Sequence, residues 1–418
     1  MFFGNAEDSN MLKLQKAEAK LIEHAKNFGD RDPSSFRITT QDTSIPSVVL
    51  PLKEKASKSL KQDLFMHSVR VTGTEPDPSK HDTPLVILHG YMNGALYFYR
   101  NLVGLSNHFD TVYSVDTLGC GLSSRGPSGL LSSLASKDDA SSLEDTTEEF
   151  FVEALEAWRK ANGISKMVLA GHSMGGYISV AYCEKYPKRV EQLILLSPAG
   201  VTKDDEEEIG DMFGQMSWTQ RAAFSGVRYL YNSGVTPASF SRKLPTSKSR
   251  SMVASYVEKR LAVVKDPEEQ QAVAEYLHLM AMIPGFGEDM LNRFLTSTAN
   301  GVKPTVDRIP LLQVNKVSFL YGDRDWMDIQ GGIDAYEQAR RSSSSGPQIL
   351  VYQLQEAGHL LMLDNWKGFH AGVVAMVSGR QAVSSSKYPM PELVRGGPRR
   401  RKNNNFAPRV GRKLQQSR

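Results

Sequence analysis

The stretch MVLAGHSMGGYISV, residues 167–180, decides the fold. Residues 171–175 within it read GHSMG, which is a G-x-S-x-G pattern. The pattern stands between an apolar run at 167–170, suited to a buried strand, and a helix-like stretch at 177–186. A strand that turns sharply into a helix at such a motif places the serine at the top of a sheet.

The chemistry of a serine nucleophile accounts for the glycines of this motif. A serine hydroxyl reacts well only when a base can reach it, and the sharp turn lifts the side chain of Ser173 clear of the sheet. Gly171 and Gly175 leave room for the turn, because a side chain at either position would collide with neighbouring backbone. We therefore predict Ser173 as a nucleophile and the N–H of Met174, at the start of the helix, as one oxyanion donor.

Further apolar runs of strand length surround the motif. They occur at residues 64–71, 85–88, 111–115, 192–197, 317–321 and 349–352. Helical patterns alternate with several of these runs, as at residues 145–160. Repeated strand–helix units predict an α/β fold with a mainly parallel sheet, right-handed crossovers and flanking helices.

The run at 85–88 leads directly into His89-Gly90-Tyr91. A loop of this kind after a strand is the usual source of the second oxyanion donor in serine hydrolases, and here the backbone N–H of Tyr91 is the candidate. His89 precedes the nucleophile, and we expect it to brace the loop.

The spacing of apolar residues changes from strand-like to helix-like after the run at 192–197. Residues 202–306 are helix-like and rich in large apolar side chains, which predicts a helical cap inserted between strands. These methionines and aromatic residues suit either an acyl-chain pocket or the cap's own core. They include Met212, Phe213, Met216, Trp218, Phe224, Tyr229, Tyr231, Met252, Tyr256, Tyr276, Met280, Met282 and Phe286.

The candidate base follows from chain order. A triad in the order Ser, acid, His restricts the base to the histidines after Ser173, which are His278, His359 and His370. His278 lies inside the predicted cap, and His370 lies well past the last strand. His359 follows the strand at 349–352 on a glycine-containing loop, where a ring nitrogen can reach Ser173, so we predict His359 as the general base.

The candidate acid has to hold the other ring nitrogen of His359. Asp325, third after Gly322 on the turn that leaves a strand, is the best placed. Asp323 and Asp328 are near neighbours and remain alternatives, because one residue of loop geometry decides among them.

Composition places the chain among soluble globular proteins. It has 418 residues, of which 40% are hydrophobic and 23% charged. Cys120 and Cys183 are the only cysteines, which predicts no disulfide framework and favours a reducing, intracellular compartment. No apolar run is long enough to cross a bilayer, so we expect any membrane contact to be peripheral. Cytosol, lipid-droplet surface and mitochondrion all stay open as locations.

The two ends of the chain differ from its middle. Residues 11–28 have apolar side chains at helical spacing, which predicts an amphipathic helix that either docks on the protein or lies on a membrane surface. From residue 391 to the end there are nine Lys or Arg against one acid. Such a tail is expected to be disordered, and it either contacts anionic lipid head groups, serves as a targeting signal or is simply solvated. We expect no nucleic-acid partner.

These features divide the chain into five parts. We predict an N-terminal helix and extension at 1–60, a first half of the core at 61–200, a helical cap at 201–305, a second half of the core at 306–385 and a basic disordered tail at 386–418.

Five motifs in order resemble the alpha/beta-hydrolase fold. Within it they are most similar to the lipid-acting subfamily of lysophospholipases, N-acyl-phospholipid lipases, lipid-droplet lipase coactivators and cardiolipin-specific deacylases of fungi. The resemblance covers residues 60–380. The motifs are HGY at 89–91, DTLGCGLSSR at 116–125, GHSMGG at 171–176, YGDRDWMD at 321–328 and GHLLMLDN at 358–365.

The resemblance implies a triad of Ser173, Asp325 and His359, with the Tyr91 and Met174 amides as the oxyanion hole. The coactivator branch lacks the nucleophilic serine, which this chain keeps, so an active enzyme is implied. Relatives often have a glycine-rich loop after His-Gly, whereas this chain has Tyr91 followed by Met92 and Asn93.

The subfamily also carries a His-x4-Asp pattern associated with acyl transfer to lysophosphatidic acid. Here His359 and Asp364 match it. His359 is already assigned to the triad, so we interpret Asp364 as structural.

The sequence thus predicts a serine lipase that hydrolyses acyl esters of phospholipids or lysophospholipids, cardiolipin included, through an acyl-enzyme, without a metal or organic cofactor. Three alternatives remain, which are a lysophosphatidic acid acyltransferase, a carboxylesterase for small esters, and a non-enzymatic scaffold on a lipid surface. Epoxide hydrolase and dehalogenase activities are disfavoured, because on this fold they need a carboxylate where Ser173 stands. The oligomeric state stays open.

Overall fold

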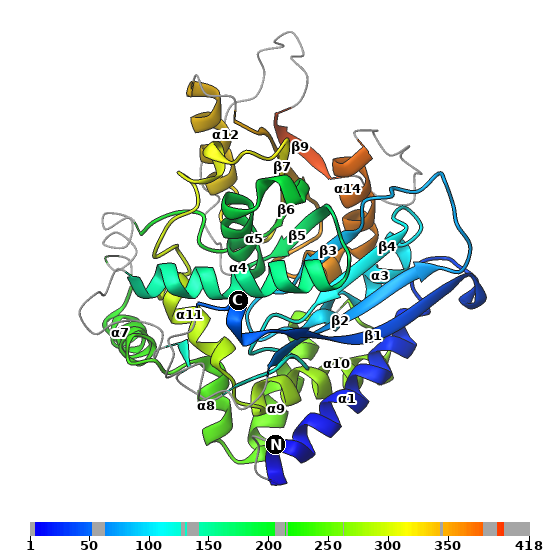
Figure 1. Ribbon diagram of the computed structural model, residues 1–418. Helices are drawn as coiled ribbons and strands as arrows, with labels where there is room; N and C mark the ends of the chain where they lie inside the picture. Colours follow the sequence, from blue (N-terminus) through cyan, green and yellow to red (C-terminus); the bar gives the residue numbers. More distant parts are fainter. Residues whose placement is uncertain are drawn as a thin grey trace.

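The computed structural model describes residues 5–51, 63–126, 130–131, 142–204, 214, 216–261, 263–342, 346–378 and 391–396 (Figure 1). These residues form one nine-stranded sheet in the order β1-β2-β4-β3-β5-β6-β7-β8-β9. The strands are β1 (Phe36–Ile45), β2 (Leu64–Gly73), β3 (Leu85–Leu88), β4 (Thr111–Val115), β5 (Met167–His172), β6 (Val190–Leu196), β7 (Lys316–Gly322), β8 (Gln348–Leu354) and β9 (Glu392–Arg395).

The central strands, from β4 through β3, β5, β6 and β7 to β8, pair in parallel. The outer strands β1, β2 and β9 pair antiparallel with their neighbours. The predicted α/β architecture with a mainly parallel sheet is therefore confirmed. Because connections between parallel strands carry helices, both faces of the sheet are covered.

The helices fall into layers on the two faces of the sheet (Figure 1). Alternate residues of β3 belong to different hydrophobic clusters, as expected when successive side chains point to opposite faces. Helices α4, α5, α11 and α12 contribute to one cluster, and α1, α3, α10 and α14 to the other. The longer helices are α1 (Asn5–Ala25), α3 (Tyr99–Leu105), α4 (Ser142–Ala161), α5 (Met174–Lys185), α7 (Trp218–Asn232), α8 (Pro237–Lys243), α9 (Thr246–Arg260), α10 (Pro267–Met282), α11 (Asp289–Phe294), α12 (Gln330–Arg341) and α14 (Trp366–Ser378), and α13 (Leu361–Asp364) is a single turn.

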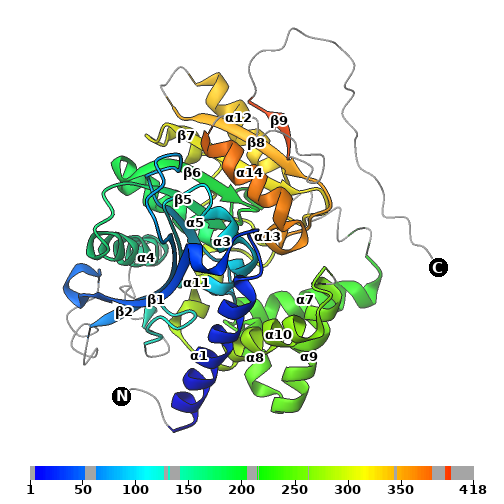
Figure 2. The same cartoon turned by 90° about the vertical axis from the view of Figure 1, so that its right-hand side faces the viewer.

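The N-terminal helix α1 docks on the body of the protein. Leu14, Leu21 and Ala25 are buried, and the helix packs against α10 and α3 (Figure 2). Lys20 forms an ion pair with Glu275 of α10 at 3.2 Å. Of the two expected roles, docking is thus the one observed. The helix begins at Asn5 rather than at residue 11, because its first turns carry no apolar periodicity from which to predict them.

Helices α7 to α11 lie between β6 and β7 in the chain, where the helical insertion was expected. Residues 205–213, 215 and 262, which include Met212 and Phe213, lie outside the described part of the chain. The large apolar side chains of the insertion divide into two groups. Tyr276, Met280 and Phe286 are buried, whereas Trp218 is 80% exposed and Tyr229 73% exposed. Apolar composition alone therefore does not distinguish the core of this region from its surface.

The structure differs from the sequence prediction at both edges of the sheet. The ten-residue strand β1 lies inside the segment 1–60 that was predicted as an N-terminal helix and extension, and β9 lies inside the segment 386–418 that was expected to be disordered. β9 is ordered by antiparallel pairing with β8. Residues 397–418, which hold most of the basic tail, lie outside the described residues. Within the described part of the chain, no helix is both long and apolar enough to span a membrane.

Candidate active site

Ser173 stands on a strained turn between β5 and α5. Its backbone has φ 53° and ψ −120°, a conformation that a non-glycine residue rarely adopts. Its N–H donates to the carbonyl of Leu196 at 2.9 Å, and its carbonyl accepts the N–H groups of Gly176 and Ala199. These bonds to the neighbouring strand and loop hold the turn in place.

The two motif glycines are sterically required. A Cβ on Gly171 would lie 2.5 Å from the Ser179 hydroxyl, and a Cβ on Gly175 would lie 2.5 Å from the His89 carbonyl oxygen. Across the turn, a Cβ on Gly90 would lie 2.9 Å from the Cβ of Ser173. The loop after β3 thus passes directly beside the serine, as an oxyanion loop must.

Asp325 and His359 meet at the ends of β7 and β8. Asp325 Oδ1 lies 3.1 Å from His359 Nδ1, and the Asp325 side chain is buried. The N–H of Met327 donates to the same oxygen at 3.0 Å. Burial acts to raise the pKa of Asp325, but the hydrogen bond and the charge of His359 outweigh it, so the pKa is lowered overall. Asp325 is therefore held ionised against the imidazole ring.

The other two candidate acids have different partners. Asp323 Oδ1 accepts the N–H of Ala357 at 2.9 Å, which ties the two loops together. Asp328 Oδ1 accepts the N–H of Gln330 at the start of α12. The Asp323 contact is possible because Gly322 lies against residues 357 and 358, where a Cβ would collide with their backbone. Of the three aspartates, Asp325 is the one placed on the His359 ring.

His172, the residue before the serine, contacts His359, although no role was predicted for it. Its Nε2 lies 2.9 Å from the His359 carbonyl oxygen, and the two rings are 4.8 Å apart. Burial, followed by the nearby charge of His359, lowers the pKa of His172 to about 3, so the ring is neutral and Nε2–H is the donor. The hydrogen bond ties the loop that carries His359 to the turn that carries Ser173.

Trp326 is a second residue beside His359 for which no role was predicted. Its ring centroid lies 4.8 Å from that of His359, and its side chain is largely exposed. Trp326 follows Asp325 directly in the chain. Its position beside the ring therefore depended on the choice among Asp323, Asp325 and Asp328, which stayed open in the sequence.

His89 braces the loop after β3, as expected. Its Nδ1–H donates to the Gly90 carbonyl at 2.7 Å, and its Nε2 accepts the N–H of Thr117 at 3.1 Å. Burial lowers the pKa of His89, which keeps the ring neutral and suits one donor and one acceptor. The loop that carries Tyr91 is thereby attached to the loop after β4.

Asp116 fastens the same loops through its carboxylate. It accepts the N–H of Ala95 at 2.6 Å and that of Leu122 at 2.8 Å. Beside it, a Cβ on Gly94 would collide with the Tyr276 hydroxyl of α10. Insertion helix α10 therefore packs closely over the loop after β3.

Asp364 lies behind the histidine loop rather than on the histidine. Its Oδ2 accepts the N–H of Gly358 at 2.8 Å. Burial raises its pKa. The contact shapes the loop one residue before His359, which agrees with a structural role.

Comparisons with known proteins identify the fold family of the chain. The chain matches the family model described as the alpha/beta hydrolase fold over residues 83–365. It is 29% identical over 317 residues to a "Probable 1-acylglycerol-3-phosphate O-acyltransferase" of Oryza sativa subsp. japonica, covering 74% of this chain and 69% of that protein. It is 29% identical over 271 residues to the "(Lyso)-N-acylphosphatidylethanolamine lipase" of Mus musculus, covering 62% of this chain and 70% of that protein.

Among solved structures, the carboxylesterase CesB from Bacillus subtilis is similar, with a TM-score of 0.51 at 18% identity, over 89% of this chain and 99% of that one. At that identity the likeness concerns the fold alone. The family match covers most of the chain and includes the G-x-S-x-G turn, and the chain therefore belongs to the alpha/beta-hydrolase fold family.

Proposed function

We propose that this protein is a serine hydrolase that cleaves acyl ester bonds of phospholipids or lysophospholipids through an acyl-enzyme. One observation carries the proposal. Ser173 stands on a strained turn at the carboxyl end of β5, and the hydrogen-bonded pair of Asp325 and His359 stands after β7 and β8 at the same edge of the sheet. The hydrogen bond from His172 to the His359 carbonyl brings the two parts together.

In the proposed mechanism, the Ser173 hydroxyl oxygen attacks the ester carbonyl carbon while His359 accepts the hydroxyl proton. Asp325 fixes the tautomer of His359 and stabilises its positive charge. The N–H groups of Tyr91 and Met174 hold the oxyanion. The ester C–O bond then breaks, His359 gives its proton to the departing oxygen, and the acyl group stays on Ser173. Water attacks this ester in the same way, releases the fatty acid and restores the serine. No step needs a metal or an organic cofactor.

Acyl transfer is a second candidate for the same site. The curated relatives of this chain include a rice protein named "Probable 1-acylglycerol-3-phosphate O-acyltransferase" and an Arabidopsis thaliana protein named "1-acylglycerol-3-phosphate O-acyltransferase", each 29% identical. If a lysophospholipid hydroxyl replaces water as the attacking group, the acyl-enzyme passes its acyl chain to that lipid. Exclusion of water by a cap favours this outcome. We propose helices α7 to α11 as that cap, with Asp364 shaping the His359 loop in both reactions.

Helix α7 has the features of a helix that touches a lipid surface. Trp218, Val227, Tyr229 and Leu230 are all exposed on it. The sequence of α7, WTQRAAFSGVRYLYN, contains two arginines and no acidic residue. Exposed aromatic and apolar side chains together with positive charge are typical of a helix that lies at a membrane interface. We propose that the protein binds lipid surfaces peripherally through α7.

The experiment is labelling with a fluorophosphonate probe, which reacts with activated serines. Wild type should be labelled and Ser173→Ala should not. The matched control is Ser179→Ala on α5, where the hydroxyl bonds only to the Gly175 carbonyl among the described contacts, and it should keep labelling. Phospholipids and lysophospholipids, cardiolipin among them, then compete with the probe, and products are analysed with and without lysophosphatidic acid. Well-folded wild type that resists labelling would contradict the proposal and favour a lipid-surface scaffold. Blocking by small soluble esters alone would favour a carboxylesterase.

A further inference from the structure

The end of β6 connects the turn of Ser173 to the strand that leads to Asp325. The carbonyl of Leu196, the last residue of β6, accepts the N–H of Ser173 at 2.9 Å. The N–H of the next residue, Ser197, donates to the carbonyl of Leu320 in β7 at 2.8 Å. Ser197 therefore lies at the edge of the sheet where the proposed nucleophile and its acid come together.

Ser197 is fully buried in a strained backbone conformation. It has no exposed surface, and its φ is 43°, in the left-handed region that favours glycine. A glycine would adopt this conformation without strain, so the backbone alone does not account for a serine here. Because strained residues persist where the surrounding structure holds them and cluster at functional sites, the conformation points to a role for the hydroxyl.

The hydroxyl of Ser197 and one oxygen of Asp325 are both buried without a hydrogen bond of standard length and angle. Ser197 Oγ and Asp325 Oδ2 each complete none within the described part of the chain. The other carboxylate oxygen, Oδ1, already accepts from His359 and from the N–H of Met327. A buried carboxylate oxygen without a donor is costly, so Oδ2 needs a partner at close range.

The Ser197 hydroxyl lies close enough to the Asp325 carboxylate to act on it. Burial raises the pKa of Asp325, and His359 does most to lower it again. The Ser197 hydroxyl lowers the pKa further, as a hydrogen-bond donor does, and it does so more than the Met327 N–H. Since a hydroxyl proton rotates about its C–O bond, a small adjustment of the serine side chain turns this contact into a full hydrogen bond.

We propose that Ser197 is a positioning residue, whose hydroxyl donates a hydrogen bond to Asp325 Oδ2 and thereby fixes the carboxylate that orients His359. With both oxygens engaged, the carboxylate cannot turn about its Cβ–Cγ bond, and His359 Nδ1 keeps its partner during each proton transfer. Ser197 acts through Asp325 alone and touches no substrate. Its effect on turnover rests on the hydrolase function proposed above, whereas the hydrogen bond itself does not.

The kinetic test is a double-mutant cycle between Ser197 and Asp325. Ser197→Ala should lower kcat about 3- to 30-fold in the wild-type background, since a hydrogen bond to a charged group is lost. In the Asp325→Asn background it should lower kcat by less than about twofold, because the hydroxyl then has no carboxylate to hold. The matched control is Ser179→Ala, which removes an equally buried hydroxyl from α5 and should keep the wild-type kcat.

Two further variants separate positioning from folding. Ser197→Gly removes the hydroxyl but relieves the backbone strain, so it should lower kcat as Ser197→Ala does while unfolding at a temperature at least as high. The test therefore stands if Ser197→Ala fails to fold. Ser197→Cys retains a weaker donor and should recover part of kcat.

A second measurement needs no turnover. The proton that His359 Nδ1 shares with Asp325 should give a low-field 1H NMR signal, identified by its disappearance in His359→Gln. This signal should move or broaden in Ser197→Ala and Ser197→Gly and stay in place in Ser179→Ala. An unchanged signal in both Ser197 variants, or an equal loss of kcat with and without the Asp325 carboxylate, would overturn the proposal. Absence of turnover in wild type would count against the hydrolase function instead, and the NMR comparison would still decide the role of Ser197.

Discussion

His172 Nε2 lies 2.9 Å from the carbonyl oxygen of His359, although the two residues are 187 positions apart in the chain. The bond links the turn of the predicted nucleophile to the loop of the predicted base. It uses the backbone of His359 and leaves the Nε2 of that ring available for proton transfer. The spacing between nucleophile and base therefore depends on a neutral, buried histidine that takes no part in the chemistry.

Replacing His172 should misplace the base without removing it. We expect His172→Phe to keep labelling by a fluorophosphonate but to lower kcat by about 10- to 100-fold, because small displacements of a catalytic group are costly. KM should change little. His172→Gln keeps a side-chain N–H donor and should restore part of kcat. Equal kcat in wild type and His172→Phe would contradict this positioning role.

Asn substitutions of the three aspartates after β7 should differ in their effect on kcat. Asp325→Asn should lower kcat about 10³- to 10⁴-fold, because it loses the carboxylate that fixes the His359 tautomer. Asp328→Asn should leave kcat near the wild-type value. Asp323→Asn should mainly lower the midpoint of thermal unfolding, since its carboxylate accepts the Ala357 N–H. The measurement is kcat together with thermal unfolding for each variant, and a larger loss of kcat in Asp323→Asn than in Asp325→Asn would reverse the assignment.

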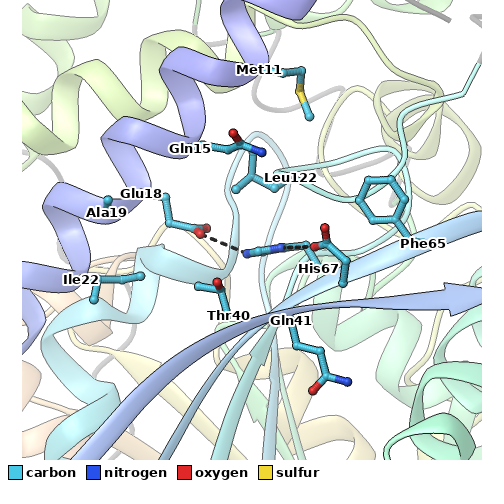
Figure 3. A pocket seen from close by; sticks show the side chains of 11 residues that line it. Met11, Gln15, Glu18, Ala19, Ile22, Thr40, Gln41, Phe65, His67 and Leu122 are labelled. Atoms are coloured by element: carbon cyan, nitrogen blue, oxygen red, sulfur yellow. Dashed lines mark hydrogen bonds and ion pairs between the residues drawn. The ribbon is translucent and has the colours of Figure 1, made fainter. Parts of the chain in front are cut away.

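His67 of β2 lies between a carboxylate of α1 and a carboxylate of β1 (Figure 3). Its Nε2 lies 3.1 Å from Glu18 Oε1, and its Nδ1 lies 2.6 Å from Asp42 Oδ1. Burial acts to lower the pKa of His67, but the hydrogen bonds to the two carboxylates outweigh it and raise the pKa.

Stability should therefore depend on pH through His67. Its pKa is about 10 in the folded protein and 6.5 ordinarily, so its contribution is fully present below pH 6.5 and is lost as pH rises toward 10. That contribution is at most about 4 to 5 kcal/mol and is smaller in practice, because Asp42 is partly exposed and water screens its share. Urea unfolding of wild type should show a free energy of unfolding that falls from pH 7 to pH 10. His67→Gln should be less stable at pH 7 and should show a flatter slope, and parallel slopes would refute the assignment.

His172 should make the free energy of unfolding depend on pH in the acidic range. Its folded pKa of about 3 lies below 6.5, so below pH 6.5 the unfolded state takes up a proton that the folded state does not. The free energy of unfolding should therefore fall as pH drops from 6.5 toward 3. His172→Phe should reduce this dependence while leaving the slope above pH 7 unchanged, as measured by urea unfolding over the whole range.

Two glycine substitutions should have opposite effects. Gly175→Ala brings a Cβ to 2.5 Å from the His89 carbonyl, so we expect loss of probe labelling and a lower midpoint of thermal unfolding. Gly226→Ala in α7 meets no atom within 4 Å and should raise stability by about 0.5 to 1 kcal/mol through helix propensity. Thermal unfolding of both variants checks the pair.

Trp218 should contribute to lipid binding without affecting chemistry. Trp218→Ala should reduce sedimentation with anionic phospholipid vesicles, while turnover of a soluble ester stays unchanged. Raised salt should weaken vesicle binding, because Arg221 and Arg228 act through charge. Val48→Ala, which alters another highly exposed apolar side chain, is the control. Unchanged vesicle binding in Trp218→Ala would contradict the proposed role of this side chain in lipid binding.

The sequence predicts the central sheet well, because its parallel strands are buried on both faces and appear as continuous apolar runs. Leu85–Leu88 and Thr111–Val115 have the predicted bounds. The edge strands are different. Most side chains of β1 face solvent, so FRITTQDTSI carries little apolar pattern, and β9 has four residues whose order comes from pairing with β8.

Residue roles within the candidate site were predictable only where chain order or turn geometry decides them. The strand-to-helix turn at Ser173 follows from its glycines. The choice among Asp323, Asp325 and Asp328 depends on side-chain directions in one loop, and the spacing of apolar residues in the sequence does not encode these directions. His172 is the variable position of G-x-S-x-G, so its bond to His359 appears only when distant strands come together.

Because α1 packs against α10, α1 cannot be fully buried before α10 has been synthesised. During synthesis from the N-terminus, residues 5–25 emerge long before residues 267–282, which form part of the surface they cover. At ordinary elongation rates the delay is on the order of ten to fifty seconds. Throughout that interval, Leu14 and Leu21 lack the partner helix that buries them in the finished protein. A nascent chain of this protein should therefore expose the apolar face of α1, which attracts a chaperone, until residues 267–282 have been made.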